Sequence, residues 1–338
     1  MKRKKWDKLL GLVLTMGILS GLLAGCSKEN APSPSKDGAA KQKAVIAYAG
    51  GTCEAPVFVA YHKGFFTEEG LAVELVQAGF EQLKQGLAAG KIDATQANFA
   101  WFKPIEQGLN IKLTAGMHTG CIKAVTPADS GIKSIKDLKG KTIGIDAIGG
   151  GPMIALSTKL RENGINPTTE VQWKAYPGPQ LDEAIKKNEI QAYMTWDPFP
   201  TQAHDHNNHM YLLDIGTDDP FKDSYCCFVG INGDLVSKDP EKAAAITRAL
   251  LKAAEWVGNN PQEAAQISLD NKYVGGDLKL NSELLDSYDW KPSIKQAQNN
   301  IKFYIKELKT QGILEAGTNE DDLYKTVFAQ VIPDFNGE

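Results

Sequence analysis

The sequence has no excess of positive charge and no C-x-x-C motif. Its 37 Lys and Arg residues are outnumbered by 41 Asp and Glu residues, which gives a formal net charge of −4. This balance argues against binding to nucleic acid, whose phosphates attract basic surfaces. None of its five cysteines forms a C-x-x-C pair, so the sequence offers no motif for a structural zinc site.

Long apolar runs are also scarce. The uncharged segment 9–25 is short, is interrupted by glycines and ends in Leu-Ala-Gly before Cys26, which does not fit a permanent membrane span. With the basic start of the chain, it predicts a secretion signal over 1–25. Cleavage would leave Cys26 for lipid attachment; an ordinary signal followed by a chance cysteine is the alternative. Removing five Lys or Arg residues and one Asp lowers the formal charge to about −8.

The segment that follows has no large apolar side chain between residues 27 and 43. It therefore cannot bury enough surface to fold. We expect residues 26–43 to comprise the lipid-bearing Cys26 and a flexible tether, which as a random coil reaches roughly 20–25 Å.

Strand and helix patterns alternate twice along the rest of the chain. Each β-α-β-α-β run predicts a parallel sheet with right-handed crossovers, and two runs predict two lobes. The expected strands cover 44–48, 71–76, 92–96, 142–145, 170–174 and 190–194, and the expected helices cover 56–62, 80–89, 152–163 and 179–188.

The C-terminal part is predicted to be helical. Asp239-Pro240 and Asn260-Pro261 each place a capping side chain before a proline, which is typical of a helix start. Apolar residues then recur on one helical face between Ile294 and Leu308. These helices need a sheet to cover, and the first lobe provides it if the chain returns there through residues 225–231.

Several segments resemble one known family. The segments are P-V-F-V-A-Y-H-K-G-F-F-T-E-E-G-L at 56–71, G-K-I-D-A at 90–94, D-S-G-I-K-S-I-K-D-L-K-G-K-T-I-G-I at 129–145 and Y-M-T-W-D-P-F at 193–199. They stand in the order found in the sulfonate, taurine and nitrate binding proteins of ABC importers, a family that shares its fold with the yeast thiamine-pyrimidine synthases. The resemblance covers nearly the whole chain after the tether.

The resemblance implies the α/β fold of type II periplasmic binding proteins, with two lobes, mostly parallel sheets and two crossing strands. Its first lobe would comprise 44–125 and 228–338, and its second 126–227. A monomer anchored by lipid at the extracytoplasmic face of the membrane would capture a small polar solute such as a sulfonate, taurine or nitrate. Hinge closure would present it to an ABC permease with its ATPase. Neither catalysis nor a cofactor is expected.

Ligands of open α/β sheets lie beyond the carboxyl ends of the strands. This rule and the resemblance together give the expected ligand-binding residues, which are Tyr48, Gly51, Thr52, Cys53, Glu54, Gln96, Asn98, His118, Cys121, Gly150, Gly151, Pro152, Trp196, Asp197, Tyr225 and Cys226.

Two of these segments have alternatives. The glycines at 149–151 precede a helix, so their amides could grip an oxyanion, but a tight turn without a ligand has the same sequence. Asp197-Pro198 first suggests a helix N-cap followed by proline, while Trp196 could still wall the pocket.

The cysteines after the signal all fall on predicted cleft segments. They could be small buried residues, or Cys53 and Cys121 could form a disulfide. A sharper hypothesis is a soft-ligand pocket, in which thiolates with Glu54, His118 or Asn98 hold a thiophilic metal or a sulfur-containing solute. The four cysteines are Cys53, Cys121, Cys226 and Cys227.

Glu54 complicates the binding of an anion. A carboxylate in the first binding loop repels an anion unless a cation or hydrogen bonds offset it. It could instead meet the amine of a zwitterion or face solvent.

For His204, His206 and His209, a solvated polar turn is the favoured interpretation and an exposed metal site the alternative.

An enzyme is the competing class. Tyr225-Cys226-Cys227-Phe228 is similar to the cysteine-rich strand of the thiamine-pyrimidine synthases, but a gap-free alignment from Gly90 places that family's lysine and histidine at Ala97 and Trp101. Without an amine for a Schiff base, pyridoxal-phosphate chemistry has no starting point.

A binding protein for a pyrimidine, a metal chelate or another thiophilic compound is the third possibility. Aromatic residues near strand ends could stack on a flat ring, although such residues are often simple core. They are Phe99, Trp101, Trp196 and Tyr225.

Overall fold

The computed structural model describes residues 41–332. The predicted secretion signal, Cys26 and most of the tether lie outside this range. Strand β1 begins at Gln42, so the last two residues assigned to the tether belong to a sheet. Within residues 41–332, no helix is long and apolar enough to cross a membrane.

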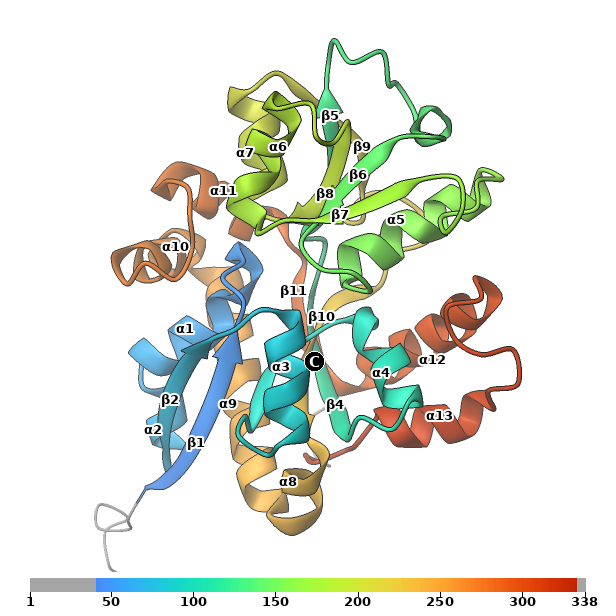
Figure 1. Ribbon diagram of the computed structural model, residues 1–338. Helices are drawn as coiled ribbons and strands as arrows, with labels where there is room; N and C mark the ends of the chain where they lie inside the picture. The colour runs from blue at the N-terminus through green and yellow to red at the C-terminus, as the bar shows by residue number, and fades with distance from the viewer. Residues whose placement is uncertain (1–40, 333–338) are drawn as a thin grey trace, which may run out of the picture. The chain divides into compact units, whose positions relative to one another are not determined.

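The strands form two sheets, one in the upper part and one in the lower part of Figure 1. The first has the order β11-β4-β10-β3-β1-β2 and the second the order β7-β6-β8-β5-β9. The strands of the first sheet are β1 (Gln42–Tyr48), β2 (Leu71–Gln77), β3 (Ala94–Ala97), β4 (Ile111–Thr119), β10 (Tyr225–Asn232) and β11 (Trp290–Ser293). Those of the second are β5 (Ile122–Pro127), β6 (Thr142–Ile145), β7 (Gln172–Ala175), β8 (Ala192–Trp196) and β9 (His209–Asp214).

Most strands of each sheet run in one direction. β1 pairs in parallel with β2 and β3, whereas β10 is antiparallel to β3 and β4, and β11 is antiparallel to β4. In the second sheet β6 is parallel to β7 and β8, and only β5 opposes its neighbours. The predicted α/β fold with two mostly parallel sheets is therefore confirmed.

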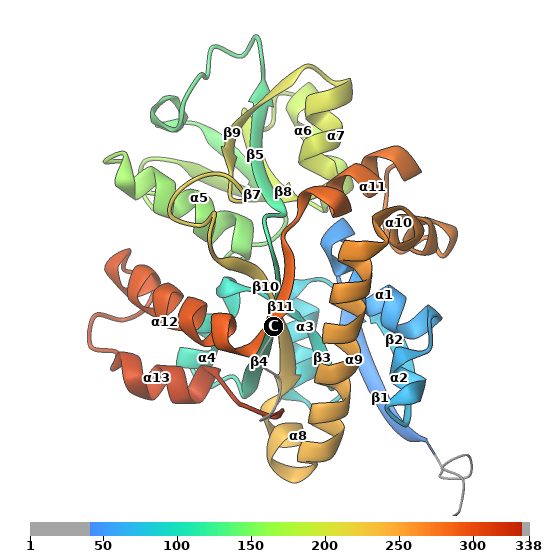
Figure 2. The same ribbon diagram turned by 180° about the vertical axis from the view of Figure 1, so that it is seen from behind.

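The helices divide between the sheets. α5, α6 and α7 contact strands of the second sheet, while α9, α12 and α13 contact β4 of the first (Figure 2). The helices are α1 (Ala55–His62), α2 (Phe65–Glu68), α3 (Phe80–Ala88), α4 (Phe102–Glu106), α5 (Gly151–Glu162), α6 (Leu181–Lys186), α7 (Phe199–His206), α8 (Gly233–Lys238), α9 (Pro240–Asn259), α10 (Pro261–Asp270), α11 (Leu278–Ser287), α12 (Ile294–Thr310) and α13 (Glu320–Val327).

Helix α9 shows why these segments fold as the sequence predicts. The Asp239 side chain accepts a hydrogen bond from the Lys242 backbone N–H at 3.1 Å, which satisfies one free donor of the first turn. Ile246 and Leu250, one turn apart, are fully buried. Burying a side chain of this size stabilises the fold by about 1.5–3 kcal/mol.

The chain passes between the sheets twice within the described range. It leaves the first sheet after Thr119, enters the second at Ile122 and is back in the first at Tyr225. Gly120 has φ +59°, and a Cβ there would lie 2.8 Å from the Cα of Gly216. The two passages therefore lie against each other, at a contact that admits only glycine. The boundaries of the two lobes and their hinge motion remain predictions.

Candidate functional site

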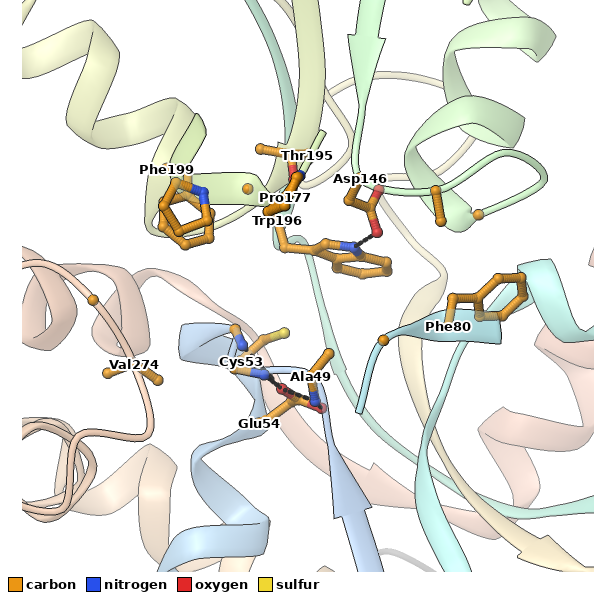
Figure 3. A pocket seen from close by; sticks show the side chains of 18 of the residues that line it. Ala49, Cys53, Glu54, Phe80, Asp146, Pro177, Thr195, Trp196, Phe199 and Val274 are labelled. Carbon is orange, nitrogen blue, oxygen red and sulfur yellow. Dashed lines mark hydrogen bonds between the residues drawn. The ribbon is translucent and has the colours of Figure 1, made fainter. Parts of the chain in front are cut away.

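A cavity of about 1080 Å³ lies among loops at the carboxyl ends of strands from both sheets. In Figure 3, Trp196 and Asp146 lie on one side of it, and Cys53 and Glu54 lie on the other. The cavity therefore lies at the carboxyl ends of the strands, which is where the sequence predicted a ligand site.

Glu54 forms the end of a short 3-10 turn, η2 (Thr52–Glu54), at the cavity wall. Its carboxylate accepts hydrogen bonds from three consecutive backbone N–H groups, of Ala49 at 2.9 Å, Gly50 at 2.6 Å and Gly51 at 2.9 Å. Burial raises the pKa of Glu54 to about 7, against the lowering effect of these donors. The backbone N–H groups of this loop are therefore hydrogen-bonded to Glu54 and are not available to an anion in the cavity.

Asp146 is the second carboxyl group of the wall. It directly follows β6 and accepts a hydrogen bond from Trp196 Nε1 at 3.1 Å (Figure 3). Its Oδ1 is inaccessible to water and has no hydrogen-bond partner among the described residues. Burial raises the pKa of Asp146 to about 6. The hydrogen bond from the Trp196 indole and the backbone N–H groups of Asp146 and Ala147 lower this pKa, but burial outweighs them.

Aromatic side chains supply much of the remaining wall. Phe80 packs edge-on against Trp101, with ring centroids 5.1 Å apart, and both line the cavity with Trp196 and Phe199. Flat walls of this kind suit a planar ligand. The other two aromatic candidates are core residues: Phe99 stacks on Tyr304, and the Tyr225 ring fills the space beside Gly116.

The predicted ligand-binding residues divide evenly. Those that line the cavity are Gly51, Cys53, Glu54, Gln96, Asn98, Gly150, Gly151 and Trp196. Those that do not are Tyr48, Thr52, His118, Cys121, Pro152, Asp197, Tyr225 and Cys226. Every member of the second group is buried; they support the wall and do not form its surface.

The amides of the predicted oxyanion turn are partly engaged. Gly150 donates its N–H to the Ala147 carbonyl at 3.0 Å, and Gly149 donates to Met153 Sδ at 3.2 Å. A Cβ on Gly151 would lie 3.0 Å from the Trp196 ring and 3.2 Å from Asn98 Oδ1. Because Gly151 has no side chain, α5 can approach both Trp196 and Asn98. This role needs no ligand and agrees with the alternative of a tight turn.

The N-cap hypothesis for Asp197 is wrong. Helix α7 begins at Phe199 with Pro198 as its N-cap. The Asp197 carboxylate forms an ion pair with Lys123 and accepts hydrogen bonds from Tyr288 Oη at 2.9 Å and Thr201 Oγ1 at 2.6 Å. These contacts tie β5, α7 and the segment before β11 together.

The cysteines are four free, buried thiols, so the Cys53–Cys121 disulfide is absent. Cys53 and Cys227 line the cavity. The solvated turn predicted for the histidines is wrong in part. His204 and His206 are exposed but belong to α7, and His209 is buried at the start of β9, with Nε2 3.4 Å from Asp182 Oδ1. Among the described residues, the group of three or more potential metal ligands is Cys53, His118, Cys121 and Cys227.

Comparison with known proteins gives a family match to the description NMT1/THI5 like over residues 52–264. This match covers more than half of the sequence. The chain belongs to the NMT1/THI5-like family. The predicted resemblance to nitrate and sulfonate binding proteins is thereby confirmed.

The names of its individual relatives refer to different bound solutes. The chain is 25% identical to the nitrate/nitrite binding protein NrtA of Nostoc over 68% of this chain, but it spans only 58% of that protein. It is 24% identical to the riboflavin-binding protein RibY of Chloroflexus aurantiacus, over 88% of this chain and 86% of the relative. The solved structure of the alkanesulfonate-binding protein SsuA from Xanthomonas axonopodis, bound to MOPS, has a TM-score of 0.71 at 14% identity and covers 86% of this chain and 99% of its own.

Sequence reasoning missed several wall residues of this NMT1/THI5-like protein. Asp146 stands directly after a correctly predicted strand, so the strand-end rule could have found it. The segment Lys272–Gly276, which follows α10, gives no such signal. Other missed residues that line the cavity are Gln77, Phe80, Tyr176, Thr195 and Phe199.

Proposed function

We propose that this chain is the solute-binding component of an ABC importer, and that its solute is a small planar molecule that is neutral or positively charged and carries N–H donors. The observation that carries the choice of solute is the carboxyl group of Asp146, which belongs to the wall of a cavity lined by aromatic rings.

The charges of the wall support this choice over an anion. Glu54 and Asp146 both contribute carboxyl groups, and the described lining contains no arginine. Its lysines are exposed: Lys186 is paired with Asp182 at 2.9 Å, and Lys272 lies in the loop after α10. An anion would meet two carboxylates without a buried cation to offset them. An aminopyrimidine, with N–H groups on a flat ring, fits both features of the wall.

A thermal-shift panel tests the class of solute. The purified chain is heated with aminopyrimidines, aromatic amines, taurine, alkanesulfonates and nitrate. A ligand present at a hundred times its Kd stabilises the fold by about 2.7 kcal/mol, so the planar amines should raise Tm by several degrees. Stabilisation by nitrate or sulfonates alone would overturn the proposed solute while leaving the importer role intact.

The mechanism of capture follows from the two passages between the sheets. The lobes, 44–125 with 228–338 and 126–227, rotate about these passages and enclose the solute, which creates the surface that a permease recognises. Small-angle scattering should show a smaller radius of gyration with solute than without it. An unchanged radius at saturation would contradict hinge closure.

The location of the protein is proposed from its sequence. Cys26 carries lipid after removal of residues 1–25, and the monomeric chain works at the extracytoplasmic face beside the permease and its ATPase. The Cys26→Ser variant, expressed in cells fed a labelled fatty acid, should lose the label that the wild type acquires. Retention of the label by the variant would refute this anchor.

A further inference from the structure

Four thiols and one imidazole gather in the protein interior just behind the cavity wall. Cys53 comes from η2, Cys121 from the passage between β4 and β5, and Cys226 and Cys227 from β10; His118 lies in β4. All five side chains are buried, to at most 2% exposure.

The spacing of this group fits a four-coordinate metal ion. One ligand atom each of Cys53, His118, Cys121 and Cys227 lies within 4.8 Å of all the others, and the Sγ atoms of Cys121 and Cys227 are 3.7 Å apart. A tetrahedral zinc site with Zn–S bonds of about 2.3 Å places its sulfur atoms about 3.8 Å apart. The group therefore needs a contraction of an ångström or less.

The imidazole of His118 has one nitrogen without a hydrogen-bond partner among the described residues. Its Nδ1 lies 3.0 Å from the Thr119 carbonyl oxygen, so Nδ1 carries the proton and donates it there. Its Nε2 then holds the lone pair, and this atom is buried without a hydrogen-bond partner. A backbone carbonyl behind a histidine is the usual support of a metal-binding imidazole.

Gln96 supplies the second support. Its Nε2 lies 3.3 Å from Cys53 Sγ and 3.2 Å from Cys227 Sγ. N–H donors aimed at sulfur disperse the negative charge of thiolates. Because Gln96, Cys53 and Cys227 line the cavity, an ion can also reach the group from that side.

We propose that Cys53, Cys121 and Cys227, as thiolates, together with His118 Nε2 bind one thiophilic divalent cation of the zinc type, at the inner edge of the solute cavity. The ion would join η2 to β4 and β10, and so fix the loop that carries Glu54. The thiols lose three protons to the solvent when the ion binds. The neighbouring Cys121 thiol and burial raise the pKa of Cys53 to about 11, and burial and the Cys226 thiol raise that of Cys121 to about 12. Because the thiols must lose their protons to bind the ion, affinity should rise with pH.

The first test uses the full wild-type chain, reduced and stripped of metal by a chelator. Cobalt(II) should give sulfur-to-cobalt charge-transfer bands and the intense d–d bands of a tetrahedral site, and one equivalent of Zn²⁺ should abolish them. X-ray absorption of the zinc form should show three sulfur atoms at about 2.3 Å and one nitrogen at about 2.0 Å. Octahedral cobalt spectra, or a shell of oxygen atoms alone, would overturn the proposal.

The second test compares matched variants. Cys121→Ser, Cys227→Ser and His118→Ala should each lose the tetrahedral cobalt spectrum, whereas Gln96→Leu should weaken zinc binding about 10- to 100-fold. Cys226→Ser is the control, because this thiol is equally buried and lies 3.0 Å from Cys121 but is not one of the four ligands. Equal loss in the control would refute the assignment.

These outcomes do not depend on the identity of the solute. Unfolding curves of the metal-free variants show whether each one folds, and the absorption spectrum of the wild type requires no variant. Zinc should raise Tm of the wild type and not of Cys227→Ser. Failure of the metal site would leave the proposed importer function untouched, since that function is tested by solute binding.

Discussion

Asp146 and Asp197 follow the neighbouring strands β6 and β8 of the second sheet, yet their surroundings differ. Asp197 is fully buried, and both of its oxygens have partners, from Lys123, Tyr288 and Thr201. Asp146 has one donor, Trp196, and one oxygen without a partner. A buried polar atom without a hydrogen bond is costly. We propose that this difference distinguishes a carboxylate that holds the fold from one that receives a ligand.

The largest expected effect comes from breaking the ion pair of Asp197. Lys123→Met keeps a long side chain but leaves the Asp197 charge without its cation in the protein interior. Removing one partner of a buried pair costs about 3–5 kcal/mol, and urea unfolding should show a loss of this size. As a control, Lys238→Met removes an exposed lysine paired with Asp234 at 2.8 Å and should change stability by less than about 0.5 kcal/mol. A similar small change in Lys123→Met would show that Asp197 does not hold the fold.

In contrast to Lys123→Met, Asp146→Asn should strongly reduce solute binding and change the free energy of unfolding only slightly. Hydrogen bonds to charged groups contribute about 1.5–3 kcal/mol, so the affinity for an aminopyrimidine, measured by calorimetry, should fall about 10- to 150-fold. Asp182→Asn is the comparison variant, because this carboxylate also lines the cavity and its Oδ1 also lacks a hydrogen bond among the described residues, but its Oδ2 is paired with Lys186.

Two results would contradict this role of Asp146. One is an aminopyrimidine affinity in Asp146→Asn within twofold of the wild type. The other is a tighter binding of sulfonates by the wild type than by the variant, since removing a negative charge should favour an anion.

The dependence on pH sharpens the same comparison. Burial raises the pKa of Asp146 to about 6, above about 3.9 for an unfolded Asp. The folded state therefore binds this proton more tightly, so its stabilising effect is complete below pH about 4 and is lost as pH rises through about 6. The stability of Asp146→Asn relative to the wild type should rise over this range in urea unfolding. A constant difference from pH 4 to 7 would show that Asp146 has an ordinary pKa.

Local patterns predicted the strands β1, β2, β3, β6, β7 and β8 and the helices beside them, but not β4, β5, β9 or β11. Asp239-Pro240 marked the start of α9, because a helix N-cap depends on residues three positions apart. The partners of Asp197 lie 74 and 91 positions away in Lys123 and Tyr288, and no local pattern contains them. The sequence suggested an N-cap there because Asp before Pro is typical of one.

The same distinction explains the site. Strand ends placed Cys53 and Trp196 at the cavity, since the order of strands decides which ends meet. His118 lies in β4 directly before its last residue, Thr119, and Cys121 follows that strand, but both side chains are fully buried and neither lines the cavity. The direction of a side chain at an irregular crossing depends on the close contact of Gly120 with Gly216, which the sequence does not reveal.

The smallest expected effect comes from Lys272, the exposed lysine of the lining. Lys272→Gln should change the affinity for an aminopyrimidine by less than about twofold, because solvent and salt screen a charge at an exposed position. Calorimetry at low and at physiological salt measures this directly, with Lys279→Gln as a control outside the cavity. If the solute were a sulfonate or nitrate, Lys272 would be an unpaired cation available to it. A tenfold or larger loss of affinity in Lys272→Gln would then show that Lys272, and not Asp146, determines the charge of the solute that binds.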